Sequence, residues 1–231
     1  MAVSTHFVNL LSKSRLTAID GFRKNPAAAQ DKNLKKLIRH LSATRYGQET
    51  GVSADDRYER FADRVPIATY DTLKPYIDRM RQGEENVLWD SRVEWFAKSS
   101  GTTADVSKYI PVSKESLQEC HYQGARDVLA VYLNNHPGSK LFTGKTLTLG
   151  GSYAIDADSG GKVRTGDLSA ILIRNTPFYA STYRTPSPET ALTADFEEKI
   201  RKICAETVPQ NITSFAGVPS WNMVLLNAVL Q

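Results

Sequence analysis

The sequence has few of the residues that build disulfide frameworks or metal sites. Its 231 residues include two cysteines, Cys120 and Cys204, and neither belongs to a Cys-x-x-Cys pair. Both lie in helical patterns among apolar neighbours, so we expect buried free thiols and a reducing compartment. The four histidines are scattered without the spacing of a metal-binding motif. The sequence therefore predicts no metal site made by its own side chains.

Long apolar runs and secretion signals are also missing. No apolar run approaches the roughly 18 residues that a membrane span needs. The first fifteen residues, MAVSTHFVNLLSKSR, lack an apolar stretch that ends in a small-residue cleavage site. A hydrophobic content of 41% and a charged content of 23% are ordinary for a globular chain. We therefore expect a soluble cytoplasmic protein without a membrane partner.

The chain lacks the dense basic face of a nucleic-acid-binding protein. Its net charge is +4, and residues 1–60 hold eleven Lys and Arg against six Asp and Glu. The basic residues at 32–39 alternate with the apolar stripe of one predicted helix, which is typical of a solvated helix face. The sequence therefore predicts no nucleic-acid partner.

The order of the predicted elements indicates an α/β fold with mixed β-sheets flanked by helices. Residues 1–85 are expected to be mainly helical, with a break at Asn25-Pro26, and residues 86–231 to be α/β. We expect one large domain over the whole chain, residues 1–231. Strands are predicted at 93–97, 108–112, 141–149, 163–173 and 211–215, and helices at 113–134, from 193 and from 219.

Two helices have apolar residues on more than one face. In the predicted helix 113–134, Val128 and Val131 lie opposite Leu129 and Leu133, which suggests burial on both sides. The last helix is apolar around its whole circumference, so we expect it to be buried. It reaches Gln231 without a cap, which suggests a chain that is cut there.

The strongest candidate for a binding segment is residues 96–113, FAKSSGTTADVSKYIPVS. Its Ser-Ser-Gly-Thr-Thr cluster lies between two predicted strands, where hydroxyls and backbone N–H groups can converge on phosphate oxygens. Gly101 permits a close approach of the backbone, and Lys108 adds a positive charge on the returning strand. An ordinary polar turn and an exposed strand lysine explain the same residues.

This cluster, followed by a lysine, resembles the phosphate loop of the adenylate-forming superfamily. Four blocks in order resemble the acyl acid–amido synthetases, the auxin-responsive-promoter family, in its bacterial form. They are VPIATYDTLKPYIDRM, FAKSSGTTADVSKYIPVS, GGSYAIDADSGGKVRTGDLSAIL and ITSFAGVPSWNMVLL. The resemblance runs from about Phe7 to the last residue and implies the N-terminal part of the large domain of such an enzyme.

The resemblance implies a two-step ligase. A carboxylate attacks the α-phosphorus of ATP, usually with Mg²⁺, and an amine such as that of an amino acid then displaces AMP to form an amide. The residues that this implies for phosphate binding are Ser99, Ser100, Gly101, Thr102, Thr103 and Lys108. The alternatives are a ligase that forms acyl-CoA or another thioester, and a non-catalytic module that binds carboxylate or nucleotide.

The resemblance also implies an acyl-acid pocket. Its predicted residues are Tyr122, Arg126, Ser152, Ser214 and Gly217, which come from the helix after the phosphate loop and from two later loops. A guanidinium at Arg126 can hold a carboxylate through two parallel hydrogen bonds, although an internal ion pair or a side chain that reaches out to solvent explains it as well. Ordinary turns equally explain the glycines of the two loops.

Other parts of the superfamily pattern are out of place or absent. The RTGDL stretch resembles a ribose-binding motif, but it follows the phosphate loop too closely, so we interpret Gly166-Asp167 as a hairpin or strand-start feature. The later aromatic-x-x-Ser/Thr-Glu motif and the C-terminal domain with its mobile lysine are not in these 231 residues. We therefore expect the chain alone to have little or no ligase activity and no confident catalytic residue.

Overall fold

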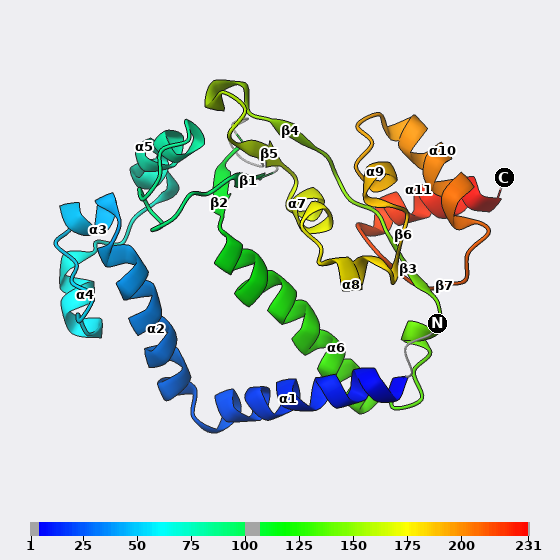
Figure 1. Ribbon diagram of the computed structural model, residues 1–231, viewed down its shortest axis with the longest axis horizontal. Coiled ribbons are helices and arrows are strands. Elements are labelled where there is room, and N and C mark those ends of the chain that lie inside the picture. Colours follow the sequence, from blue (N-terminus) through cyan, green and yellow to red (C-terminus); the bar gives the residue numbers. More distant parts are fainter. Residues whose placement is uncertain (1–4, 100–106, 231) are drawn as a thin grey trace. The chain divides into compact units, whose positions relative to one another are not determined.

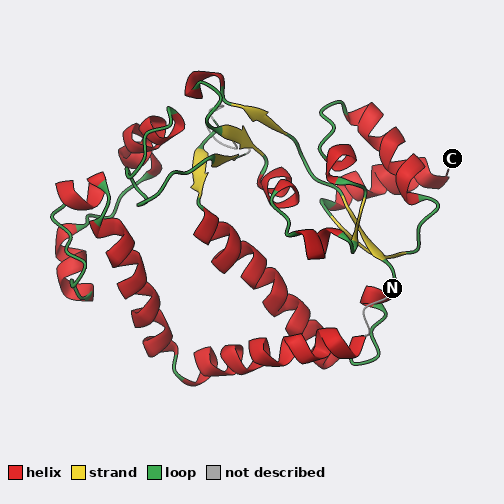
Figure 2. Cartoon of the chain, in the orientation of Figure 1, coloured by secondary structure: helices red, strands yellow, loops and turns green. Residues whose placement is uncertain are grey.

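The computed structural model describes residues 5–99 and 107–230. Figure 1 labels the elements along the chain, and Figure 2 shows that helices alone precede the first strand. The helices are α1 (Thr5–Lys24), α2 (Pro26–Ser42), α3 (Arg45–Glu49), α4 (Tyr58–Arg64), α5 (Tyr70–Arg81), α6 (Gln123–Asn135), α7 (Leu168–Arg174), α8 (Phe178–Ser181), α9 (Pro188–Ala191), α10 (Phe196–Thr207) and α11 (Pro219–Leu230). Short helical segments are the π-helix η1 (Ser116–Tyr122) and the 3-10 turns η2 (Leu141–Thr143) and η3 (Ala157–Ser159). None of the helices in the described ranges is both long enough and apolar enough to cross a membrane.

The strands are β1 (Trp95–Lys98), β2 (Tyr109–Val112), β3 (Lys145–Thr148), β4 (Tyr153–Ile155), β5 (Arg164–Gly166), β6 (Arg184–Thr185) and β7 (Ile212–Ala216). Within the described residues they form a sheet of order β2-β1-β5-β4 and a sheet of order β6-β3-β7. The β1–β2 pair is antiparallel, and β3 is parallel to both β6 and β7. The α/β class with mixed sheets and flanking helices is therefore confirmed.

The chain divides into two compact units, and each is described by itself. Unit 1 comprises Met1–Leu16, Gln123–Tyr153 and Gly166–Gln231, and unit 2 comprises Thr17–Tyr122 and Ala154–Thr165.

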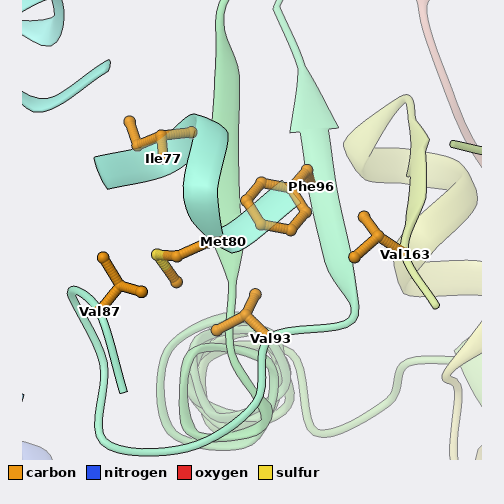
Figure 3. Packing of buried hydrophobic residues seen from close by; sticks show 6 residues of the cluster. All are labelled: Ile77, Met80, Val87, Val93, Phe96 and Val163. Atoms are coloured by element: carbon orange, nitrogen blue, oxygen red, sulfur yellow. The ribbon is translucent and has the colours of Figure 1, made fainter. Parts of the chain in front are cut away.

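The core of unit 2 joins helix α5 to the first sheet. Ile77 and Met80 of α5 pack against Phe96 of β1, together with Val87 and Val93 from the intervening loop. Val163 completes the cluster from the segment before β5, as Figure 3 shows. Phe96 is fully buried, so this cluster fixes β1, and with it the start of the loop that follows β1.

The core of unit 1 lies between the parallel sheet and two helices. Leu147 and Leu149 from β3 and its end pack against Ile203 of α10 and Leu225 of α11. Since α10 and α11 supply these contacts, they cover one face of the sheet. The ends of its strands continue into loops.

Local sequence signals placed several element boundaries. Asn25 accepts a hydrogen bond from the Ala28 N–H at 3.2 Å, and Pro26 is the first residue of α2. The Ser113 hydroxyl accepts a hydrogen bond from the Ser116 N–H at 3.0 Å and so caps the helix predicted there. Both positions agree with the sequence-based expectation.

The predicted strand 163–173 is wrong beyond Gly166, because residues 168–174 form α7. A short apolar run such as Leu-Ser-Ala-Ile-Leu-Ile does not distinguish a buried strand from a buried helix. Gly166-Asp167 is therefore the boundary between a strand and a helix and not a hairpin. Likewise, β3 covers only residues 145–148 of the strand that was expected at 141–149.

The expected two-sided burial of the helix after residue 113 is also wrong. Val128 is 69% exposed and Val131 is 40% exposed, whereas Ala130 and Leu133 are buried. One reason is η1, whose i to i+5 hydrogen bonds change the number of residues per turn. Faces counted at 3.6 residues per turn across this stretch therefore do not align.

The prediction of an all-round buried last helix is wrong for the described chain. In α11, Asn222 and Leu225 are buried, but Met223 is 58% exposed and Leu230 is 84% exposed.

The prediction of buried free thiols is wrong in part: both cysteines are free, but Cys120 is exposed and Cys204 is only half-buried. Apolar sequence neighbours therefore did not suffice to bury these side chains.

Candidate functional site

Ser99 and Lys108 form the base of the loop between β1 and β2. The Ser99 N–H donates to the Lys108 carbonyl at 2.9 Å, and the Lys108 N–H donates to Ser99 Oγ at 3.1 Å. This pair continues the register in which Lys98 lies opposite Tyr109. The antiparallel ladder therefore holds both ends of the segment 100–107 together.

The middle of the predicted phosphate loop lies outside the described residues. This applies to Ser100, Gly101, Thr102 and Thr103. Of the six predicted phosphate-binding residues, the structure therefore places Ser99 and Lys108, and it brings these two into direct contact.

Lys108 presents an exposed ammonium beside this loop. Its Nζ atom lies 5.3 Å from the centre of the Tyr70 ring, within the range of a cation–π interaction. The Tyr70 hydroxyl in turn accepts a hydrogen bond from the Tyr109 N–H at 2.9 Å. Helix α5 thus supports the returning strand, while the Lys108 charge remains accessible to an anion.

Two predicted pocket loops meet at the carboxyl ends of β3 and β7. The Leu149 N–H donates to the Ala216 carbonyl at 3.1 Å. A Cβ atom added to Gly217 would lie 3.3 Å from the Leu149 side chain and 3.0 Å from Asn222 Oδ1. Residues 149–152 and 216–217 are therefore neighbours, at the edge where parallel α/β sheets commonly bind ligands.

Ser214 lies within the parallel sheet and not in a loop. It is opposite Thr146, and the two hydroxyl oxygens are 2.7 Å apart. The expectation that Ser214 belongs to a pocket loop is therefore wrong about its location. Ser152 does lie in a loop, the one between β3 and β4, where its N–H donates to Asp167 Oδ2 at 3.1 Å.

The turn at Gly150-Gly151-Ser152 is held by side chains that sequence analysis did not select. Lys199 of α10 is 3% exposed, and its ammonium donates to the carbonyls of Gly150 at 3.1 Å and Gly151 at 3.2 Å. Burial lowers the pKa of Lys199, and the Asp167 carboxylate opposes this by raising it.

The opposite side of this turn is equally fixed. The Ser169 hydroxyl accepts a hydrogen bond from the Gly151 N–H at 3.0 Å. A Cβ atom on Gly151 would lie 1.8 Å from Asp167 Oδ2, and one on Gly150 would lie 2.4 Å from Ile173 Cδ1. A Cβ atom at position 151 would therefore displace the whole Asp167 side chain, whereas one at position 150 would displace only the end of the Ile173 side chain.

A sequence signal for Lys199 was present in the pattern of α10. Lys199 follows Phe196 by three residues and precedes Ile203 by four, which places it on the apolar face of the helix. A charged residue on that face is uncommon and indicates a specific partner.

Tyr122 and Arg126 lie on one continuous helical segment. Tyr122 is half-buried at the end of η1, and Arg126 is exposed on α6. Tyr122 belongs to unit 2, whereas Arg126, Ser152, Ser214 and Gly217 belong to unit 1. Within unit 1, the structure joins the turn containing Ser152 to the Gly217 region.

No group of three or more His, Cys, Asp or Glu side chains suited to a metal ion occurs among the described residues. Around Gly150 and Gly151, the oxygen atoms that could bind a metal ion belong to backbone carbonyls, to hydroxyl groups and to the Asp167 carboxylate. The carbonyls of Gly150 and Gly151 are already occupied by the Lys199 ammonium.

Comparisons with known proteins agree with the resemblance seen in the sequence. A putative indole-3-acetic acid-amido synthetase from Oryza sativa subsp. japonica is 32% identical over 57% of this chain and 27% of its own length. A jasmonoyl–L-amino acid synthetase from Nicotiana attenuata is 31% identical over 41% of this chain and 17% of its own length. The chain thus spans about a quarter or less of the length of these relatives. Both come from plants, and the bacterial form of the family stays a prediction.

Solved structures show the same fold. An acyl acid amido synthetase, AtGH3.15 in complex with 2,4-DB, matches with a TM-score of 0.76 and 20% identity, over 94% of this chain and 38% of that one. Residues 15–162 match the family described as the GH3 family N-terminal domain. This match covers well over half of the sequence, including both ends of the loop at Ser99 and Lys108, and the chain therefore belongs to the GH3 family.

Proposed function

We propose that this protein acts in an ATP-dependent acid–amido ligase reaction. In the first step, a carboxylate oxygen bonds to the α-phosphorus of ATP, and pyrophosphate leaves. In the second step, an amine such as that of an amino acid bonds to the acyl carbon, AMP leaves with the electron pair of the broken C–O bond, and the nitrogen releases one proton to solvent. The names of the relatives, which describe amido synthetases, support an amide product over a thioester.

The observation that carries this proposal is the closed base of the β1–β2 loop. The mutual hydrogen bonds of Ser99 and Lys108 bring the ends of a hydroxyl-rich segment together beside an exposed ammonium. Phosphoryl chemistry depends mainly on such positioning and on charge stabilisation. In this proposal, Ser99, Lys108 and the Ser100, Gly101, Thr102 and Thr103 of the loop hold the phosphates of ATP.

We further propose that the carboxyl edge of β3 and β7 forms one wall of the acyl-acid pocket. Ser152 and Gly217 lie at this edge, and the Lys199 contacts to Gly150 and Gly151 fix its shape. Ser214 contributes from within β7, and Arg126 of α6 belongs to the same unit. Arg126 would bind the substrate carboxylate through its guanidinium.

ATP would bring Mg²⁺ with it. Mg²⁺ usually keeps several waters and binds through substrate phosphates together with one or two protein ligands. Since the described residues provide no group of three candidate side chains, the donors proposed here are the loop hydroxyls and the phosphates themselves.

A two-part experiment tests this function. The chain alone should bind ATP but release no AMP, because it spans only part of the length of its relatives. A chimera in which it replaces the matching region of AtGH3.15 should release AMP only when both a carboxylic acid and an amino acid are present. AMP release by the isolated chain that depends on an amino acid would contradict the first part. If coenzyme A replaced the amino acid as acceptor in the chimera, the amide assignment would be wrong.

A further inference from the structure

A cavity lies within unit 2, and neither Ser99 nor Lys108 lines it. It has a volume of about 530 Å³, which lies in the usual range for small-molecule pockets. Its walls come from α2, α5, β2, η1 and the loop after α5, so we call it the η1 cavity. Leu37, Met80, Trp89 and Pro111 supply apolar surface.

The charged residues of the η1 cavity carry a negative surplus. Among the described residues that line it, Glu115 and Glu119 are carboxylates and Lys36 is the ammonium. Lys36 forms an ion pair with Glu119, which leaves the charge of Glu115 uncompensated by a cation of the cavity wall.

Trp89 and Glu115 hold each other in a defined position. The indole N–H of Trp89 donates to Glu115 Oε2 at 2.9 Å, and the Trp89 ring stacks on His40 at 4.5 Å between ring centres. Burial raises the pKa of Glu115, but hydrogen bonds from its own backbone, Ser113 and Trp89 outweigh this and lower it. The cavity thus combines an ionised carboxylate with an aromatic wall.

The π-helical geometry of η1 shapes one side of this cavity. Ser116, Glu119 and Cys120 all line it and all belong to η1. π-Helical segments are rare compared with α-helices, and they occur frequently at functional sites. This π-helix therefore supplies one of the two carboxylates of the cavity, Glu119, and Glu115 lies directly before it.

We propose that the η1 cavity binds an organic ammonium ion, a primary amine carried on an apolar or aromatic body. The body packs against Trp89 and Leu37, and the ammonium meets the carboxylates of Glu115 and Glu119. A carboxylate ligand of the same shape would be repelled by the excess negative charge of the cavity and would bind more weakly. The inference does not rest on the proposed ligase function, because it concerns binding without ATP.

The test compares three probes of the same shape on the wild-type chain: 2-phenylethylamine, 2-phenylethanol and 3-phenylpropionate. Titration calorimetry should give a dissociation constant on the order of millimolar for the amine, as expected for so few non-hydrogen atoms. The alcohol should bind more weakly, and the carboxylate should bind most weakly. The amine should also change tryptophan fluorescence in the wild type but not in Trp89→Phe.

Two charge variants give opposite predictions for the same cavity. Glu119→Gln should weaken amine binding about two- to fivefold, and Lys36→Gln should strengthen it by a similar factor. Both side chains are partly exposed, so both variants should unfold at the wild-type urea concentration.

Any of three results would overturn the proposal: carboxylate binding as tight as amine binding, a shift in the same direction in both variants, or no saturable amine binding up to about 10 mM. The probe series on the wild type decides the matter even if a variant proves unstable.

Discussion

At the scale of single residues, the shape of the proposed acyl-acid pocket depends on a buried lysine. Lys199 is 3% exposed and holds two backbone carbonyls of the turn at 150–151. The family resemblance directed attention to Ser152 and Gly217, which are near this turn. It did not identify Lys199. The helical spacing places this lysine on the apolar face of α10, but its partners are the carbonyls of Gly150 and Gly151, which local spacing does not reveal.

Replacing Lys199 by methionine should destabilise the chain by about 1–3 kcal/mol, because two buried carbonyls lose a charged donor. Urea unfolding measures the change. Lys202→Met is the matched control, since Lys202 lies on the same helix in an exposed pair with Glu198, and its effect should stay within about 0.5 kcal/mol. Equal effects of the two variants would show that the Lys199 contacts do not stabilise the turn.

The same residue predicts a pH dependence. The pKa of Lys199 in the folded chain is lowered from the ordinary value of 10.5. Between the lowered pKa and 10.5, the unfolded chain binds more protons than the folded chain, so the free energy of unfolding rises with pH. The stability advantage of the wild type over Lys199→Met should therefore grow as the pH rises toward 10.5. An advantage that falls over this range would contradict the assignment.

At the scale of elements, sequence patterns predicted those helices and strands whose signals are local. The helix break at Asn25-Pro26, the helical region before residue 85 and the strands predicted at 93–97 and 108–112 follow from turn residues and apolar periodicity. Patterns failed where tertiary contacts decide the outcome. The run at 168–174 became the helix α7, and η1 changed the helical repeat before α6.

Two glycines test the difference between a constrained turn and a helix interior. Gly151→Ala should destabilise the chain by about 1–3 kcal/mol, because its Cβ would meet the Asp167 carboxylate that also holds Ser152. Gly124→Ala should instead stabilise it by about 0.5–1 kcal/mol, because Gly124 lies in α6 with nothing within 4 Å of an added Cβ. Thermal or urea unfolding measures both. A neutral Gly151→Ala would mean that the turn adapts freely.

At the scale of the whole molecule, the sequence predicted the fold class and the family, whereas side-chain burial was predicted less well. The apolar circumference of α11 suggested burial, but much of it is exposed in the described chain. Burial depends on what the rest of the fold places against a helix, and a single helix pattern does not contain that information. For the candidate site, sequence analysis selected Ser99 and Lys108 among six predicted phosphate-binding residues, and the contact between these two was found only in the structure.

The most direct measurement is a calorimetric titration of ATP with Mg²⁺ into the wild-type chain, Lys108→Met and Lys114→Met. Both lysines are exposed, but only Lys108 lies at the base of the β1–β2 loop. The wild type should bind ATP, Lys108→Met should bind it about threefold or more weakly, and Lys114→Met should match the wild type. Absence of ATP binding to the wild type, or an equal loss in both variants, would contradict the assignment of this loop to nucleotide phosphates.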